Sequence, residues 1–459
     1  MKTVVMLALS ISLLGCKFFS KKSDDSPPAS SQENWDLADD PEEPHNNNHV
    51  VMVVDDGIDP NQPSYKDKVL ASYTLVCNSD SSGLDYSSPQ AYKKSLLKKI
   101  DSSREYVFGS HCTLEEGIRL DLHTPPSHIM DKRKEWNYRI RKKEYDVVDK
   151  LREVYESIRS LVGKYHGTNV TAMIAYKNPN VRFVLVQVKL GSRGDSIRCA
   201  DIRAVIPILN IIHDKDIQEA YRNKAVLSEW KIIDDLAKKH HVSLINKSYG
   251  LTRVDWVDEL KHSQCDPRMV EPLSSFHTAY MTLENDLAKK MNIFYDTAPY
   301  LTIQAAGNDA SRSDSINDNY FCSKAPNHLM VGSYNLNKGQ EQISKFSTYG
   351  ACVNLYSLGG NIITSNPFKF LSLTNGTSFA TPLTVRYANI NFSESMKPEE
   401  MSKELLARLD SRQFLPPSKH FRYAAFDEGP GQLKLAHKNI AINDESKELN
   451  RSFMELRMP

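Results

Sequence analysis

The chain has 459 residues, of which 40% are hydrophobic and 25% are charged, and its formal net charge is +1. This length is sufficient for one large folded domain or two, and the composition is typical of a soluble globular protein. Because the charges nearly balance, they provide no general electrostatic attraction for nucleic acid, and we expect no nucleic-acid partner.

The first 15 residues have the pattern of a signal peptide. A basic residue precedes an apolar run from Val4 to Leu14 that is too short to cross a bilayer. The following letters, LLGC, resemble a bacterial lipobox, which implies a lipid anchor on Cys16; an ordinary signal peptide with an incidental cysteine is the alternative. We therefore expect an exported, membrane-anchored lipoprotein on the periplasmic face or the cell surface. Lys17 is not the aspartate that retains lipoproteins in the inner membrane of enteric bacteria, which favours the outer membrane.

The segment after the signal peptide, residues 16–48, is rich in Ser, Pro, Asp, Glu and Asn and has no hydrophobic period. Such a composition buries too little apolar surface to fold, so we expect a disordered tether that holds the folded part away from a membrane. We expect a single folded domain over residues 49–440 and a C-terminal tail at residues 441–459.

Five apolar runs predict buried parallel strands, because strands that are covered on both faces lack polar alternation. Helix-like patterns lie between them, as at Glu229–Lys239 and Ser274–Met291. Strands that alternate with helices indicate an α/β fold with a doubly wound, mostly parallel sheet flanked by helices, in which functional groups collect at the carboxyl ends of the strands. The runs are Val50–Val54, Val181–Leu190, Val242–Asn246, Leu301–Gly307 and Leu329–Asn335.

A region of about residues 78–162 interrupts this alternation. Its second half, Asp131–Val162, has apolar residues at three- and four-residue spacing, which predicts helix. We interpret the region as a helical insertion packed on the core. A lid or a partner-docking element is the alternative.

Seven cysteines are present, and six remain if Cys16 carries a lipid. An even number in an exported protein favours disulfides, and there is no CxxC pair to indicate a zinc site. We expect cysteines that are neighbours in the sequence to pair, with free buried thiols as the alternative. The expected pairs are Cys77–Cys112, Cys199–Cys265 and Cys322–Cys352.

Two polar residues occupy places that suit catalysis. Asp55, in VVDDGID, comes directly after the first buried strand, although Asp-Asp-Gly is also good turn chemistry and Asp56 and Asp59 are further carboxylates nearby. His166, in HGTNVTAMIA, precedes a helix whose glycine and small residues permit close packing, which would hold the imidazole in place. A lone histidine is otherwise more often structural.

Two further residues follow later in the chain. Asn308, in QAAGNDA, lies just past an apolar strand, where it is either a turn former or a side-chain donor to an oxyanion. Ser378, in NGTSFATP, is placed at the start of a helix, where a backbone N–H and the helix dipole favour negative charge; a simple turn is the alternative. A neutral histidine can activate a serine hydroxyl when a buried carboxylate orients the ring. Together the four residues supply an orienter, a base, an oxyanion donor and a nucleophile.

The order Asp, His, Ser and all four motifs resemble those of the subtilisin-like serine proteases, the subtilases, over about residues 49–438, and the Asp-Asp-Gly form is similar to the kexin-like branch. The resemblance implies a serine endopeptidase that hydrolyses polypeptides through an acyl-enzyme, with Asp55, His166 and Ser378 as the triad. It further implies that Asn308 and the backbone N–H of Ser378 donate to the oxyanion. The residues that would line the substrate cleft are Ser248, Tyr249, Gly250, Ala305, Ala306 and Gly307.

The chain departs from the pattern of compact subtilases. Asp55 and His166 are much farther apart, and only the tether separates Cys16 from the first strand, where a folding propeptide would be expected. The resemblance implies no required cofactor, with calcium as a structural ion whose ligands the sequence does not reveal. A monomer is favoured. The alternative function is a catalytically silent lipoprotein that keeps the fold as a binding module, although no triad member is lost.

Overall fold

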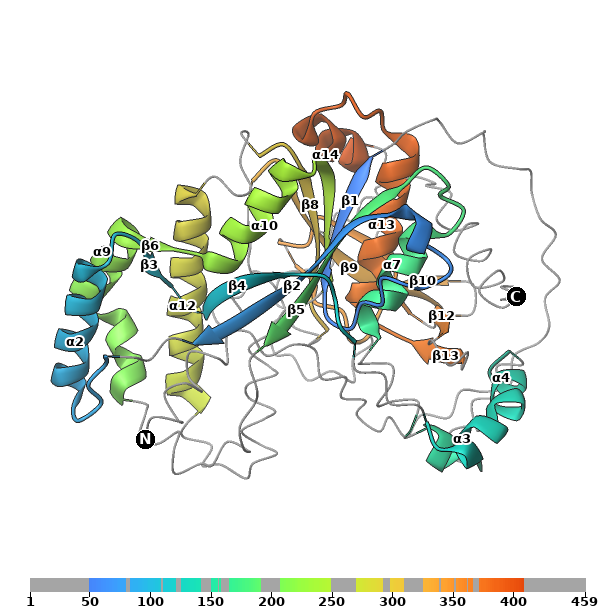
Figure 1. Cartoon of the computed structure of the whole chain (residues 1–459), viewed down its shortest axis with the longest axis horizontal. Helices are drawn as coiled ribbons and strands as arrows, with labels where there is room; N and C mark the ends of the chain where they lie inside the picture. Colours follow the sequence, from blue (N-terminus) through green and yellow to red (C-terminus); the bar gives the residue numbers. More distant parts are fainter. Residues whose placement is uncertain are drawn as a thin grey trace.

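The computed structural model describes most of residues 49–407 (Figure 1). Within this span it leaves out residues 80–82, 109, 121–124, 142–149, 156, 158–164, 191–206, 249–269, 292–297, 309–324, 338–339, 351, 361 and 366–370. The expected signal peptide, tether and C-terminal tail lie outside the described residues, as does the end of the expected domain. Of the helices in the described part of the chain, none combines the length and the apolar character that crossing a membrane requires.

A nine-stranded, mostly parallel sheet forms the centre of the described domain (Figure 1). Its order is β10-β9-β8-β7-β1-β5-β2-β4, and β11 also pairs with β9. The pairs are parallel except at the two ends of this order, where β10 and β4 run antiparallel to their neighbours. The strands are β1 (Val50–Asp55), β2 (Val69–Ser79), β4 (Ser110–Glu116), β5 (Arg182–Leu190), β7 (Val242–Lys247), β8 (Leu301–Ala305), β9 (His328–Asn337), β10 (Gln340–Ile343) and β11 (Leu355–Leu358).

The five predicted strands are confirmed as β1, β5, β7, β8 and β9. β1 lies in the middle, with β5 and β2 on one side and the later strands β7, β8 and β9 on the other. The chain therefore adds its earlier strands on one side of β1 and its later strands on the other. In doubly wound sheets, ligands bind outside the carboxyl ends of the strands at such a switch point. The carboxyl end of β1 is thus the place where this fold favours a functional site.

Helices cover both faces of the sheet (Figure 1), and β1 shows why. Val51 and Val53 pack with α7, α13 and α14, whereas Met52 and Val54 belong to the cluster that contains α10 and α12. All four side chains are 0% exposed. Successive side chains of a strand point to opposite faces, so a continuous apolar run requires cover on both sides. The helices are α7 (His166–Ala175), α10 (Ser228–Lys239), α12 (Val270–Lys290), α13 (Thr377–Asn391) and α14 (Pro398–Ala407).

The region predicted as a helical insertion, about residues 78–162, is divided in the structure. Part of its second half, for which helix was predicted, forms α4, whereas its first half contains strands as well as helices. The region contributes β4 to the edge of the main sheet, α2 and β3 to a lobe shared with η3, α9 and β6, and α3 and α4 to the opposite end of the molecule, near the hairpin of β12 and β13 (Figure 1). These elements and the remaining short one are α2 (Pro89–Ser102), β3 (Tyr106–Val107), α3 (Ser127–Asp131), α4 (Arg133–Arg141), η2 (Lys66–Lys68), η3 (Asn210–His213), α9 (Lys215–Lys224), β6 (Ala225–Val226), β12 (Ile362–Ser365) and β13 (Leu371–Thr374).

Contacts between distant parts of the sequence explain this division. Cys77 on β2 and Cys112 on β4 face each other in the antiparallel register and form the predicted disulfide, which attaches β4 to the sheet. In the lobe, the rings of Tyr106 and Phe108 lie 5.8 and 4.9 Å from that of Tyr221 on α9. Periodicity within a segment does not report such contacts, because the partners come from other segments.

The remaining cysteines are only partly described. Cys352 is also disulfide-bonded. Cys199, Cys265 and Cys322 lie outside the described residues. The pairs Cys199–Cys265 and Cys322–Cys352 therefore stay predictions.

A buried histidine links the stability of the fold to pH. His328, at the start of β9, is 1% exposed, and its Nε2 lies 3.2 Å from Oε1 of Gln304. Burial and, secondarily, the charge of Lys247 lower its pKa to about 3. An unfolded histidine titrates at about 6.5, so below that pH the unfolded state takes up a proton that the folded state does not. The free energy of unfolding therefore falls as the pH falls.

We expect His328→Asn to flatten this pH dependence. Between pH 7 and pH 5 the native protein should lose about 2 kcal/mol more of its free energy of unfolding than the variant. Denaturant titrations at each pH measure the two slopes. His111→Asn, which replaces an exposed histidine on β4, is the matched control and should keep the native slope. Equal slopes for the native protein and His328→Asn would contradict the prediction.

Candidate active site

The carboxyl end of β1 places a carboxylate in the interior. Asp55 is the last residue of β1, lies opposite Gln187 of β5 in the sheet register, and is 0% exposed. The N–H of Asp56 donates to its Oδ1 at 2.8 Å. Gly57 then takes a φ of 61°, in the left-handed region that suits glycine, and the chain turns away from the sheet. Asp55 is therefore held at the switch point by its own turn.

The start of α7 docks directly on this turn. Gly167 donates its N–H to the carbonyl of Asp56 at 2.7 Å, and Thr168 donates its N–H to the carbonyl of Gly57 at 3.1 Å. A methyl group at Gly167 would lie 2.4 Å from Ile58 Cγ1 and 2.6 Å from the carbonyl oxygen of Asp56. Only glycine permits this approach, which confirms the close packing predicted for the helix.

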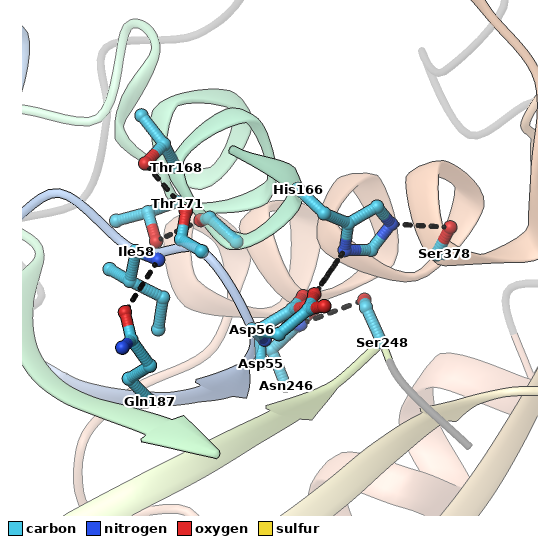
Figure 2. Close-up of polar contacts among 12 residues, drawn as sticks. Asp55, Asp56, Ile58, His166, Thr168, Thr171, Gln187, Asn246, Ser248 and Ser378 are labelled. Atoms are coloured by element: carbon cyan, nitrogen blue, oxygen red, sulfur yellow. Dashed lines mark hydrogen bonds and ion pairs between the residues drawn. The ribbon is translucent and has the colours of Figure 1, made fainter. Parts of the chain in front are cut away.

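His166, the first residue of α7, lies between Asp55 and Ser378 (Figure 2). Its Nδ1 is 2.7 Å from Oδ1 of Asp55, and its Nε2 is 2.9 Å from Oγ of Ser378. The three side chains are almost completely buried. The structure thus brings together the three predicted residues, which come from β1, α7 and α13.

Ser378 lies in the first turn of α13, as predicted. Gly376 precedes it, and a methyl group there would lie 2.8 Å from Ser378 Oγ and 3.6 Å from Nδ2 of Asn308. The hydroxyl and the amide nitrogen therefore border one small space beside Gly376. A residue with a side chain would occupy that space.

Asn308 is oriented by the residue before the serine. Its Oδ1 accepts hydrogen bonds from the N–H of Thr377 at 2.8 Å and from the hydroxyl of Thr377 at 3.1 Å. The same hydroxyl accepts the N–H of Gly307 at 3.1 Å. Because both bonds use the oxygen of the amide, the Nδ2 group is the part of Asn308 that faces the space beside Gly376.

Opposing effects act on the pKa of the His166 imidazole. Burial lowers the pKa of His166, but the carboxylate of Asp55, which is both close and hydrogen-bonded, raises it, and Asp56 adds to this. The net direction is upward. The imidazolium is therefore stabilised in a site from which water is largely excluded.

The predicted cleft residues are placed only in part. Ser248 follows β7, is 1% exposed, and accepts a hydrogen bond from Nδ2 of the buried Asn246 at 2.9 Å (Figure 2). Ala305 ends β8, and Ala306 is buried in the cluster that includes Phe379. The roles of these residues and of Gly307 in binding substrate stay predictions. Tyr249 and Gly250 lie outside the described residues.

Sequence reasoning missed three supporting residues. Thr168 donates its hydroxyl to the carbonyl of Gly57 at 2.9 Å and accepts the N–H of Asp59, Thr377 orients Asn308, and Asn246 holds Ser248. A Gly-Thr pair directly follows His166 and directly precedes Ser378, and that repeated pattern was the available signal for the two threonines. For Asn246 the available signal was a polar residue at the carboxyl end of an apolar run, the same position that pointed to Asp55.

One group of possible metal ligands occurs among the described residues, and it coincides with this site. Asp55, Asp56 and His166 present ligand atoms within 4.8 Å of one another. Asp55 and His166 are already bonded to each other in the hydrogen-bonded chain that leads to Ser378. The expected structural calcium ion therefore stays a prediction without assigned ligands.

The comparisons with known proteins identify the family. A model of the subtilase family matches residues 46–423. A search among curated proteins gave no match. Among solved structures, a cold adapted subtilisin-like serine proteinase has 15% identity and a TM-score of 0.32, with 80% of this chain and 84% of that chain covered. Sphericase has 12% identity and a TM-score of 0.38, with 82% and 88% covered. These two likenesses are too weak to add an argument, but the family match spans most of the chain. The protein belongs to the subtilase family and is a serine endopeptidase.

Proposed function

We propose that the protein hydrolyses peptide bonds with Asp55, His166 and Ser378 as its catalytic triad. The observation that carries the proposal is the unbroken chain of short hydrogen bonds from carboxylate to imidazole to hydroxyl, at 2.7 and 2.9 Å. A serine hydroxyl is a weak nucleophile unless a neighbouring base takes its proton. Because all three residues of the triad are present, we favour an active enzyme over a catalytically silent binding module.

Each group has a defined task in the reaction. Asp55 accepts the Nδ1–H of His166, which leaves Nε2 as the base toward Ser378. As the Ser378 oxygen attacks the peptide carbonyl, its proton passes to Nε2. The imidazolium then returns the proton to the leaving amine, and an acyl-enzyme remains. Water, activated by the same nitrogen, hydrolyses the ester and restores the serine.

We place the oxyanion in the space beside Gly376. The Nδ2 group of Asn308 borders this space, and the second donor is the backbone N–H of Ser378, which lies in the first turn of α13, where an N–H has no acceptor in a preceding turn. The positive end of the α13 dipole adds to the attraction for negative charge. These donors are held in place before the reaction begins, which is the condition under which they stabilise a transition state most.

We further propose that the enzyme is exported and held at a membrane by a lipid on Cys16. Support comes from the apolar run, the LLGC sequence and the polar composition of residues 16–48. A tether of this kind would let a monomeric catalytic domain reach polypeptides near the membrane, with the outer membrane favoured by Lys17. No cofactor takes part in the proposed reaction, and calcium would serve only as a structural ion.

Ser378→Ala should abolish covalent labelling by a fluorophosphonate probe, because the probe reacts with an activated serine hydroxyl. The native protein should be labelled near neutral pH, and peptide mapping should find the adduct on Ser378. Ser372→Ala, which replaces a serine on β13, is the control and should label normally. Labelling that persists in Ser378→Ala, or a folded native protein that does not react, would contradict the triad assignment.

Asn308→Ala should lower turnover by about 10² to 10³ while changing KM little, since it removes a donor used mainly in the transition state; a loss of this size is the one known for the oxyanion asparagine of subtilisin. Gly376→Ala should give a loss of similar size, because its methyl group would enter the same space. Peptide hydrolysis measures both, and melting temperatures close to native show that the fold is intact. A folded Asn308→Ala with native turnover would remove Asn308 from the mechanism.

Cys16→Ser should prevent incorporation of radiolabelled palmitate and release the protein from the membrane fraction. The expectation follows because a thioether-linked lipid requires the thiol of Cys16. Expression in a bacterial host followed by fractionation measures both effects. Cys352→Ser is a control that should still incorporate the label. Unchanged labelling of Cys16→Ser would exclude the lipid anchor.

A further inference from the structure

A second carboxylate lies beside the catalytic ring and has no part in the mechanism described above. Oδ1 of Asp56 is 3.9 Å from Nδ1 of His166, the same nitrogen that bonds to Asp55 (Figure 2). The side chain of Asp56 is 47% exposed, whereas that of Asp55 is 0% exposed. The imidazole therefore meets one buried and one half-exposed carboxylate.

The position of Asp56 is determined by its backbone. Its N–H donates to Asp55 Oδ1 at 2.8 Å, and its carbonyl accepts the N–H of Gly167 at 2.7 Å. The backbone N–H and carbonyl of Asp56 are thus bonded to Asp55 and to Gly167, the neighbour of His166. Gly57 turns the chain immediately afterwards. The backbone of Asp56 therefore cannot move away from the ring without breaking the contact between α7 and the turn after β1, and the observed side-chain conformation brings its carboxylate to 3.9 Å from Nδ1.

The other elements packed against His166 bring no further charge to it among the described residues. From α13 come the hydroxyl of Ser378 and the ring of Phe379, whose centroid lies 5.3 Å from that of the imidazole. From the end of β7 come the neutral Asn246 and Ser248. Of the described residues, Asp55 and Asp56 carry the charges that act on the pKa of His166.

We propose that ionised Asp56 is a second positioning carboxylate, which stabilises the imidazolium form of His166 and thereby both speeds turnover and raises the acidic limit of activity. The inference rests on the proposed function, because it concerns the same base. Asp56 acts through His166 and needs no contact with the substrate.

The two consequences have one electrostatic cause. A negative charge near Nδ1 favours the charged ring, which forms in the transition state when Ser378 gives up its proton. The same charge makes the free enzyme take up a proton at a higher pH, and the protonated ring is no base. Desolvation of its half-buried side chain and the charge of Asp55 raise the pKa of Asp56 to about 7, so its negative charge is largely present at pH 8 and is lost as the pH falls through neutrality. Asp56 and His166 therefore titrate as a coupled pair.

Asp56→Asn keeps the shape of the side chain and removes its charge. We expect kcat at pH 8 to fall about threefold and the acidic limb of the kcat/KM profile to move to lower pH, so that the ratio of variant to native kcat/KM rises about threefold from pH 8 to pH 5.5. Partial exposure of Asp56 keeps both effects modest. A merely structural defect would lower activity by the same factor at every pH.

Asp59→Asn is the matched control. It removes one negative charge from the same turn, but the Asp59 carboxylate accepts the N–H of Asn61 and does not act on the pKa of His166. Its pH profile should match that of the native protein. An acidic limb that is the same in Asp56→Asn and the native protein would overturn the proposal. A change confined to the KM of cationic peptides would also overturn it and would make Asp56 a substrate contact.

A measurement without turnover separates this inference from the proposed function. In Ser378→Ala, NMR titration of the His166 imidazole should give a higher pKa than in Ser378→Ala with Asp56→Asn. If the native enzyme proves inactive, the proposed function fails, but a downward shift in the double variant still supports the role of Asp56. If the imidazole titrates identically in both proteins, the role of Asp56 fails whatever the activity.

Discussion

The contact between the start of α7 and the turn after β1 is the interaction on which the active site depends. The N–H of Gly167 reaches the carbonyl of Asp56 at 2.7 Å, and the absence of a side chain at Gly167 makes this approach possible. The contact joins the strand that ends in Asp55 to the helix that begins with His166. An imidazole held at both its backbone and its Nδ1 has little freedom to leave the line between carboxylate and serine, which is the pre-organisation that general-base catalysis requires.

A second dock does the same for the other half of the site. Thr377 ties the start of α13 to Asn308 and Gly307 at the end of β8, so the serine and the amide donor are positioned by one residue. Both docks join a helix N-terminus to the carboxyl edge of the sheet. The polar groups of the site are therefore bonded to rigid elements.

The segments outside the central sheet and its covering helices are arranged around this site and not within it. The aromatic lobe of α2, β3, α9 and β6 lies at one end of the molecule, and α3 and α4 lie at the other, where α4 packs against β13 (Figure 1). β13 leads through Asn375 into the serine-bearing helix. The long separation between Asp55 and His166 in the sequence therefore adds elements at the two ends of the sheet while leaving the contact between their strand and helix intact.

The sequence by itself determined the five central strands, α10 and α12, and the start of the helices behind His166 and Ser378, because buried strands and helix starts leave local patterns of apolar, glycine and hydroxyl residues. It also predicted that Asp55, His166 and Ser378 would come together, as they do in the structure. It also predicted the Cys77–Cys112 pair, which the structure places in register on β2 and β4. Only the tertiary structure decided that the long insertion splits between two ends of the molecule, that Thr377 orients Asn308, and that Oδ1 of Asp56 lies 3.9 Å from Nδ1 of His166. These features depend on contacts between segments far apart in the chain, and no local periodicity encodes the distance between them.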